Sequence, residues 1–154
     1  MATTNGKHRI LVALDQSEGS DRVAAFVNRF FGDLDVEILA INVGHAATPM
    51  VTYGWADPMP YVDPRLLDPQ LDEAAAHRAE TDAEAVLQQS PLQDDEAIVE
   101  LGDPADTILR AAEEHGADVI VIGSSDRGVL SRLLTPSVSK KVLEHADRPV
   151  LLVH

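Results

Sequence analysis

The chain has 154 residues, 45% of them hydrophobic, which is enough to build one domain with its own core. Its 26 acidic and 12 basic residues give a formal net charge of −14, so the average surface repels nucleic acid and anionic lipid. The absence of cysteine excludes disulfides, thiolate catalysis and thiolate metal sites. Because no apolar run is long enough to span a bilayer and the N-terminus lacks a secretory signal pattern, we expect a soluble cytoplasmic protein that binds neither nucleic acid nor membranes.

The N-terminal part of the chain predicts a strand, a helix and a second strand. The apolar run "RILVAL", Arg9 to Leu14, is typical of a buried strand, and the turn and capping residues "DQSEGSD" follow it. A helical face then runs to Gly32 and consists of Val23, Ala24, Val27, Phe30 and Phe31. The segment "VEILAINV", Val36 to Val43, predicts the second strand.

The C-terminal part continues the same pattern. "EAIVEL", Glu96 to Leu101, predicts a third strand, and Asp103 with Pro104 forms a cap followed by proline at the first helical position. That helix is expected to end at Gly116. "ADVIVIG", Ala117 to Gly123, predicts a fourth strand, and "RPVLLVH" at the C-terminus predicts a fifth.

This alternation of strands and helices predicts the fold class. A further helix, from Leu71 to Gln89, is expected between the second and third strands. Right-handed crossovers between parallel strands place helices on both faces of one sheet. The sequence therefore predicts a doubly wound α/β protein with a five-stranded parallel sheet in the order 3-2-1-4-5, and we expect residues 1–154 to form a single domain.

The pattern is interrupted between Gly44 and Pro69. Five of the nine prolines lie in this segment, together with two tyrosines and the single tryptophan. Long irregular segments in compact domains are usually mobile surface loops or functional lids. We interpret residues 44–69 as a Pro-rich insertion that forms either a surface loop or a lid.

The strand order indicates where a ligand would bind. In an open parallel sheet, ligands bind beyond the carboxyl ends of the strands, where the strand order reverses. In the predicted order the reversal lies between the first and fourth strands, so the turns after Leu14 and Gly123 face one crevice. Asp15 and Gly123 are therefore candidate site residues, and the end of the second strand forms the neighbouring wall.

Three collinear segments carry a family resemblance that covers nearly the whole chain. They are "ILVALDQSEGSDRVAAFV", "LGDPADTILRAAEEHGADVIVIGS" and "RPVLLVH". Together they resemble the universal stress protein family. The resemblance implies a stress-response or signalling module that binds an adenine nucleotide, ATP, ADP or AMP with Mg²⁺.

The phosphate loop that the resemblance implies is degenerate in this chain. Nucleotide-binding members carry G-x2-G-x9-G followed by Ser or Thr, which places the first glycine at Gly123, the second at Asp126, the third at Pro136 and the hydroxyl at Ser137. Asp126 brings a carboxylate toward the phosphates, and Pro136 has no N–H to donate. Both residues are expected to weaken ATP binding.

Other binding positions implied by the resemblance are retained. Asp15 corresponds to the residue at the nucleoside end of the ligand, and the backbone near Val43 to the group that meets the base. Ser137 with the amides of Val138 and Ser139 opens the last helix, whose N-terminus favours anions, and Arg127 supplies a cation. Each of these positions also has a plain structural explanation, as a helix cap or a tight turn.

The sequence contains few residues arranged for catalysis or metal binding. The six histidines are scattered without an H-x-x-x-H pair, so we expect no metal site. The nucleophile elbow, the Walker loop and the dinucleotide fingerprint are absent from the sequence. No general base and nucleophile pair is evident, so at most slow nucleotide hydrolysis is expected and no catalytic residue is assigned.

The last strand predicts a partner. "VLLV", Val150 to Val153, lies at a predicted sheet edge without a protective charge or bulge, and such edges pair with other strands. We expect a homodimer through this strand. Two functions stay open: a dimeric binding module in which ATP binding is weakened or lost, and an ATP-binding protein that retains nucleotide through Asp15, Val43, Gly123 and the helix N-terminus at Ser137.

Overall fold

The computed structural model describes residues 6–44, 69–124 and 138–154. In chain order the elements are β1 (His8–Ala13), α1 (Glu18–Phe31), β2 (Val36–Gly44), α2 (Pro69–Gln89), β3 (Glu96–Leu101), α3 (Pro104–Glu114), β4 (Val119–Gly123), α4 (Val138–His145) and β5 (Val150–Val153). The predicted insertion between residues 45 and 68 and the turn at residues 125–137 lie outside the described residues. No helix in the described part of the chain is both long and apolar enough to cross a bilayer.

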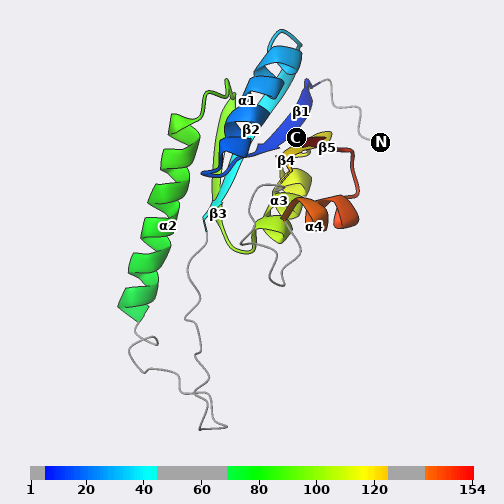
Figure 1. Ribbon diagram of the computed structural model, residues 1–154. Coiled ribbons are helices and arrows are strands. Elements are labelled where there is room, and N and C mark those ends of the chain that lie inside the picture. Colours follow the sequence, from blue (N-terminus) through cyan, green and yellow to red (C-terminus); the bar gives the residue numbers. More distant parts are fainter. Residues whose placement is uncertain (1–5, 45–68, 125–137) are drawn as a thin grey trace.

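The five strands form one parallel sheet in the order β3-β2-β1-β4-β5 (Figure 1), which confirms the predicted fold class and topology. β1 is the central strand: Ile10 pairs with Ile38 of β2 on one side and with Val119 of β4 on the other. The segments that end at Leu14 and Gly123 therefore run side by side, as the strand order predicted. Both strands therefore end at the same edge of the sheet.

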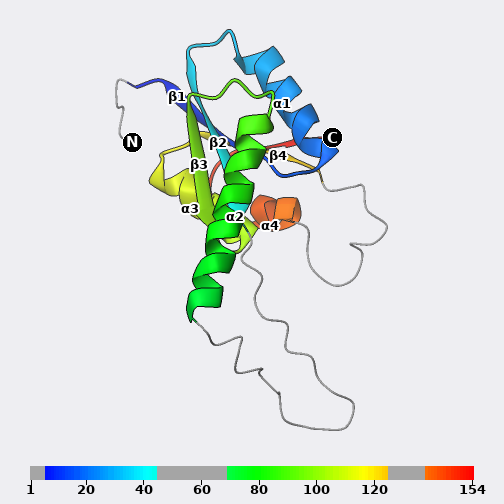
Figure 2. The same ribbon diagram turned by 90° about the vertical axis from the view of Figure 1, so that its left-hand side faces the viewer.

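The side chains of the strands alternate between two hydrophobic cores, one on each face of the sheet. Leu11 and Ile120 belong to the core beneath α3 and α4. Val12 and Val121 belong to the core beneath α1, which also takes in Leu87 from the end of α2. Figure 2 shows α2 in front of the sheet and α1 at the upper right, with α3 and α4 farther back. Helices cover both faces, as expected for a sheet of buried parallel strands.

The capping residues that predicted the helix after the third strand make the expected contacts at the start of α3. The Asp103 side chain accepts a hydrogen bond from Asp106 N at 3.1 Å, and Pro104 occupies the first position of α3. After this helix the backbone turns at Gly116 with a φ of +62°, a conformation that glycine adopts at little cost. These contacts fix α3 between the ends of β3 and β4.

We expect Gly44→Ala to lower the free energy of unfolding by about 1–3 kcal/mol, the usual cost of overpacking a core position. A Cβ atom at Gly44 would lie 2.6 Å from Leu101 Cδ2 and 2.7 Å from the Ala79 carbonyl oxygen. Urea unfolding followed by circular dichroism measures the change. Gly6→Ala is the matched control, because an added Cβ there meets no described atom within 4 Å. An equal loss of stability in both variants would contradict the packing argument.

Candidate binding site at the carboxyl end of β1

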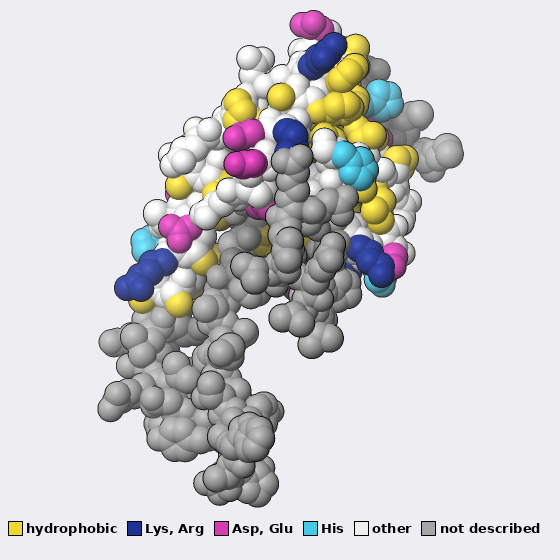
Figure 3. Space-filling view, in the orientation of Figure 1, with side chains coloured by type: hydrophobic (Ala, Val, Ile, Leu, Met, Phe, Trp, Pro, Cys, Tyr) yellow, Lys and Arg dark blue, Asp and Glu magenta, His cyan; other side chains and the backbone are white. Residues whose placement is uncertain are grey.

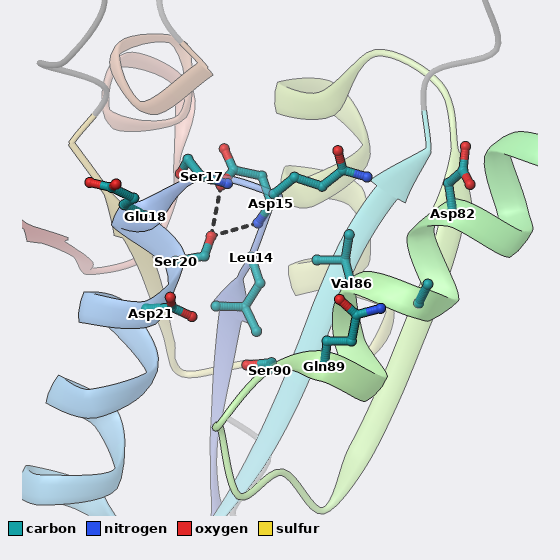
Figure 4. Close-up of a pocket in the computed structure, with 12 residues that line it drawn as sticks. Leu14, Asp15, Ser17, Glu18, Ser20, Asp21, Asp82, Val86, Gln89 and Ser90 are labelled. Carbon is teal, nitrogen blue, oxygen red and sulfur yellow. Dashed lines mark hydrogen bonds between the residues drawn. The ribbon is translucent and has the colours of Figure 1, made fainter.

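A hollow of about 660 Å³ lies beyond the carboxyl end of β1, between the start of α1 and the end of α2 (Figure 4). Its size is within the range of pockets that bind small organic ligands. The lining residues are Leu14, Asp15, Gln16, Ser17, Glu18, Ser20, Asp21, Asp82, Ala85, Val86, Gln89 and Ser90. The hollow thus combines a small apolar wall with hydroxyl, amide and carboxylate groups.

Asp15 is held at the edge of this hollow by two serines of the following turn. Its Oδ1 accepts hydrogen bonds from the Ser17 amide at 2.9 Å, from the Ser17 hydroxyl and from Ser20 Oγ at 2.7 Å. Ser20 Oγ also accepts from the Asp15 amide at 2.7 Å. No described residue donates to Asp15 Oδ2, so this oxygen can accept hydrogen bonds from a ligand.

The pKa of Asp15 lies below its ordinary value. Partial withdrawal of the carboxylate from solvent acts to raise this pKa, but the hydrogen bonds from Ser17 and Ser20 favour the charged form and outweigh that effect. Asp15 is therefore a carboxylate at neutral pH. A carboxylate of low pKa is suited to accept hydrogen bonds from hydroxyl or amino groups rather than to remove protons at neutral pH.

The floor of the hollow is fixed by Asn42 of β2. Its Nδ2 donates to the Leu14 carbonyl at 2.6 Å, and the Leu14 amide donates to the Ile41 carbonyl at 2.9 Å. Asn42 is only 7% exposed. Sequence analysis missed this residue, although a lone amide within an otherwise apolar strand was an available signal. Asp82 and Gln89 of α2, which form the far wall, were also missed.

The structure places the other predicted site residues around the same edge of the sheet but does not bring all of them into the hollow. Val43 packs against the core under α3 and α4, on the face opposite α1 and α2. A Cβ at Gly123 would face α1, 3.3 Å from Val23 Cγ2. Val138 and Ser139 begin α4, with Val138 exposed and Ser139 buried.

The remaining predicted residues belong to the turn between β4 and α4. Arg127, Ser137, Asp126 and Pro136 lie outside the described residues, so the phosphate loop stays a prediction. Among the described residues there is no group of three or more acidic or histidine side chains arranged to hold a metal ion.

The start of α4 is tied to α3 by one lysine. Lys141 Nζ lies 3.0 Å from Asp103 Oδ1 and 2.9 Å from Asp106 Oδ1. Hydrogen bonds to Asp106 and Asp103 raise the pKa of Lys141, while the Asp106 amide and then Lys141 lower the pKa of Asp103. These contacts hold α3 and α4 together.

The order of the strands, the helices on both faces and a hollow at the carboxyl end of the central strand define a doubly wound α/β protein with a site in the usual position of this class. Residues 7–154 match the model of the universal stress protein family. The chain belongs to this family, which confirms the resemblance inferred from its sequence.

Individual relatives agree with this assignment. A universal stress protein of Thermus aquaticus, from the 3′ region of a QAH/OAS sulfhydrylase, is 32% identical over 148 residues, covering 94% of this chain and 96% of the relative. The stress response protein NhaX of Bacillus subtilis is 36% identical over 86 residues, which cover 56% of this chain but only 51% of NhaX. The crystal structure of a universal stress protein in complex with cAMP has a TM-score of 0.57 at 21% identity, covering 97% of this chain and 98% of that one.

We expect Ser20→Ala to raise the pKa of Asp15 toward its ordinary value, because the carboxylate loses one of its hydrogen bonds. Titration of the Asp15 carboxyl carbon by NMR measures the shift. Since the folded-state pKa is depressed, Asp15 stabilises the fold above the ordinary carboxyl pKa, and this contribution is lost as pH falls through the folded value.

Ser90→Ala is the control for this titration, because Ser90 lines the same hollow but accepts its hydrogen bond from the Leu92 amide. The pKa of Asp15 in the Ser90→Ala variant should match its pKa in the unmodified protein. An Asp15 pKa at or above the ordinary value in the unmodified protein would contradict the hydrogen-bond account.

Proposed function

We propose that this chain is a dimeric stress-response module that binds an adenine nucleotide in the hollow beyond β1, with ATP binding weakened by its phosphate loop. The observation that carries the proposal is the ionised Asp15 carboxylate, fixed by Ser17 and Ser20 at the edge of a hollow large enough for a nucleoside. The complex of a family neighbour with cAMP supports an adenine nucleotide as the ligand class.

The lining chemistry supports recognition of the nucleoside part of the ligand. Leu14, Ala85 and Val86 offer apolar surface against which a base can pack. Asp15 Oδ2, to which no described residue donates, would accept hydrogen bonds from ribose hydroxyls or from an exocyclic amino group. The Gln89 side chain on the α2 wall provides both a donor and an acceptor. Hydrogen-bonding groups thus lie at two sides of the apolar surface.

We expect the phosphates of the ligand to contribute less binding free energy than its nucleoside part. Asp126 and Pro136 stand where the family pattern has glycines, so one carboxylate is added and one N–H is lost. In the alternative, Asp15, Val43, Gly123 and Ser137, which precedes α4 in the sequence, would retain ATP together with Mg²⁺, aided by Arg127. Val138 and Ser139 would then contribute backbone amides, as the first residues of α4.

We also propose that the module acts by binding rather than by turnover, in the cytoplasm and as one domain over residues 1–154. The low pKa of Asp15 makes it a poor general base at neutral pH. Protein partners would then respond to ligand occupancy, and residues 44–69, which connect β2 to α2 in the sequence, would act as a lid or a surface loop.

We expect the unmodified protein to bind adenosine and cAMP in isothermal titration calorimetry, and Asp15→Ala to weaken both by about tenfold or more. A hydrogen bond to a charged group contributes about 1.5–3 kcal/mol, and 1.4 kcal/mol corresponds to tenfold in affinity. Asp35→Ala, which removes an exposed carboxylate paired with Lys7, is the control. Failure of the unmodified protein to bind any adenine nucleoside or nucleotide would refute the proposed function.

The same titrations with ATP and Mg²⁺ decide between the two forms of the proposal. Asp126→Gly with Pro136→Gly should tighten ATP binding, because the loop regains a backbone donor and loses a carboxylate. Tight ATP binding by the unmodified protein would favour the alternative. An unchanged affinity in the double variant would show that these two residues do not block the site.

Homodimerisation is supported by an apolar surface around β5. All four β5 residues are half-buried, although they are hydrophobic and stand at the sheet edge. Phe26, Phe31 and Leu151 pack partly buried on one core, and Phe30 is 54% exposed beside them on α1. Figure 3 shows hydrophobic side chains gathered at the upper right, where Figure 1 places β5 and the end of α1. A second copy that pairs with β5 would cover both the open backbone edge and this surface.

We expect Leu152→Glu to convert a dimer into a monomer in sedimentation velocity, because it places charge in the proposed strand pairing. Gln88→Glu is the control, since it adds the same charge at an exposed position of α2, which packs against β2 and β3 at the other end of the sheet. A monomer mass for the unmodified protein at every concentration would refute the dimer.

A further inference from the structure

The hollow beyond β1 has walls of a single charge sign. Among the residues that the structure describes, its lining includes the carboxylates of Asp15, Glu18, Asp21 and Asp82 and no lysine, arginine or histidine. Figure 4 shows that the acidic groups come from both sides, with Glu18 and Asp21 on α1 and Asp82 across the hollow on α2. A ligand between the helices therefore meets negative charge in two directions.

These carboxylates are not neutralised by their described neighbours. In residues 6–44, 69–124 and 138–154, no ion pair involves any of the four. Lys141 is engaged by Asp103 and Asp106 on the opposite face of the sheet. Arg22 of α1 approaches Gly19 but does not line the hollow. The described part of the lining therefore carries four carboxylates and no cation to offset them.

The consequence for a nucleotide depends on its phosphate charge. Glu18, Asp21 and Asp82 are exposed, so their field is screened by water and by salt over a Debye length of about 8–10 Å. A hollow of this size keeps every group of a bound nucleotide near that distance or closer. An uncharged nucleoside experiences no net repulsion, whereas each added phosphate charge experiences repulsion from both walls.

We propose that the acidic walls of the hollow select adenine ligands by charge, favouring the uncharged nucleoside and singly charged nucleotides over ATP, with Asp21 and Asp82 as specificity-determining residues. This selection rests on the proposed function of the hollow. It is separate from the loss of glycines in the phosphate loop, because it arises from α1 and α2 and acts by repulsion rather than by missing donors.

The two effects differ in their response to salt. Repulsion by exposed carboxylates weakens as ionic strength rises, so ATP binding should strengthen with added salt. Binding that depends on favourable contacts between phosphate and cations or helix termini weakens with salt instead. The sign of the salt dependence therefore distinguishes acidic walls from a weakened but still attractive loop.

The test is calorimetry of the full chain with adenosine, cAMP and ATP at low and at physiological salt. We expect the unmodified protein to bind adenosine at least tenfold more tightly than ATP, and added salt to tighten ATP several-fold while changing adenosine by less than twofold. Asp21→Asn with Asp82→Asn should raise the ratio of ATP to adenosine affinity about fivefold or more. Asp33→Asn with Glu84→Gln makes the same change in net charge at exposed positions outside the lining and should leave the ratio unchanged.

Three outcomes would overturn the selection. ATP binding as tight as adenosine binding would refute it while leaving the nucleotide site intact. An equal rise in the ratio for the control pair would assign the effect to overall charge. Absence of binding by all three ligands would refute the proposed function and the selection together. Thermal unfolding of each variant checks the fold, because Asp21 lies in the first turn of α1, where a negative charge stabilises the helix.

Discussion

The position where β1 ends is the constraint on which the site depends. Both backbone groups of Leu14 are bound to β2: its amide donates to Ile41 at 2.9 Å, and its carbonyl accepts from the Asn42 side chain at 2.6 Å. Asn42 is almost fully buried. Without the Leu14 carbonyl as acceptor, the Asn42 side-chain amide would be unpaired in the interior, at a cost of about 1–3 kcal/mol. The strand therefore ends at a fixed point, and Asp15 enters the turn above α1 in a defined direction.

The serines that follow β1, Ser17 and Ser20, form hydrogen bonds to the Asp15 carboxylate rather than capping α1. Ser17 stands at the N-cap of α1 with extended backbone but makes no side-chain cap hydrogen bond, and its hydroxyl donates to Asp15. A serine cap typically contributes about 0.5–2 kcal/mol to helix stability. The helix is stabilised instead by burial of Val23, Ala24 and Val27 against the sheet. Such an exchange of local stability for a fixed charge is typical of binding sites.

The fold could be predicted from the sequence because burial and capping act locally. Apolar runs identified the five strands, and Asp103 with Pro104 located the start of α3. The far wall of the hollow was not predictable in this way. Asp82 and Gln89 are polar residues on a largely polar helix, and only the packing of α2 against β2 and β3 brings them across from the end of β1. Asn42 left a local signal, but its partner is a backbone carbonyl that no side-chain pattern reveals.

In the function and selection that we propose, two separate parts of the chain would act against phosphate charge. The loop after β4 carries Asp126 and Pro136 at positions of the family's glycines, and the walls of the hollow carry Asp21 and Asp82. Under the proposals above, both would reduce what a triphosphate adds to binding, while the apolar wall and Asp15 would be unaffected. If the hollow holds an adenine ligand, its binding free energy must therefore come mainly from the base and the ribose. A module of this kind would respond to the amount of nucleoside or cyclic nucleotide rather than to the phosphorylation state of the adenylate pool.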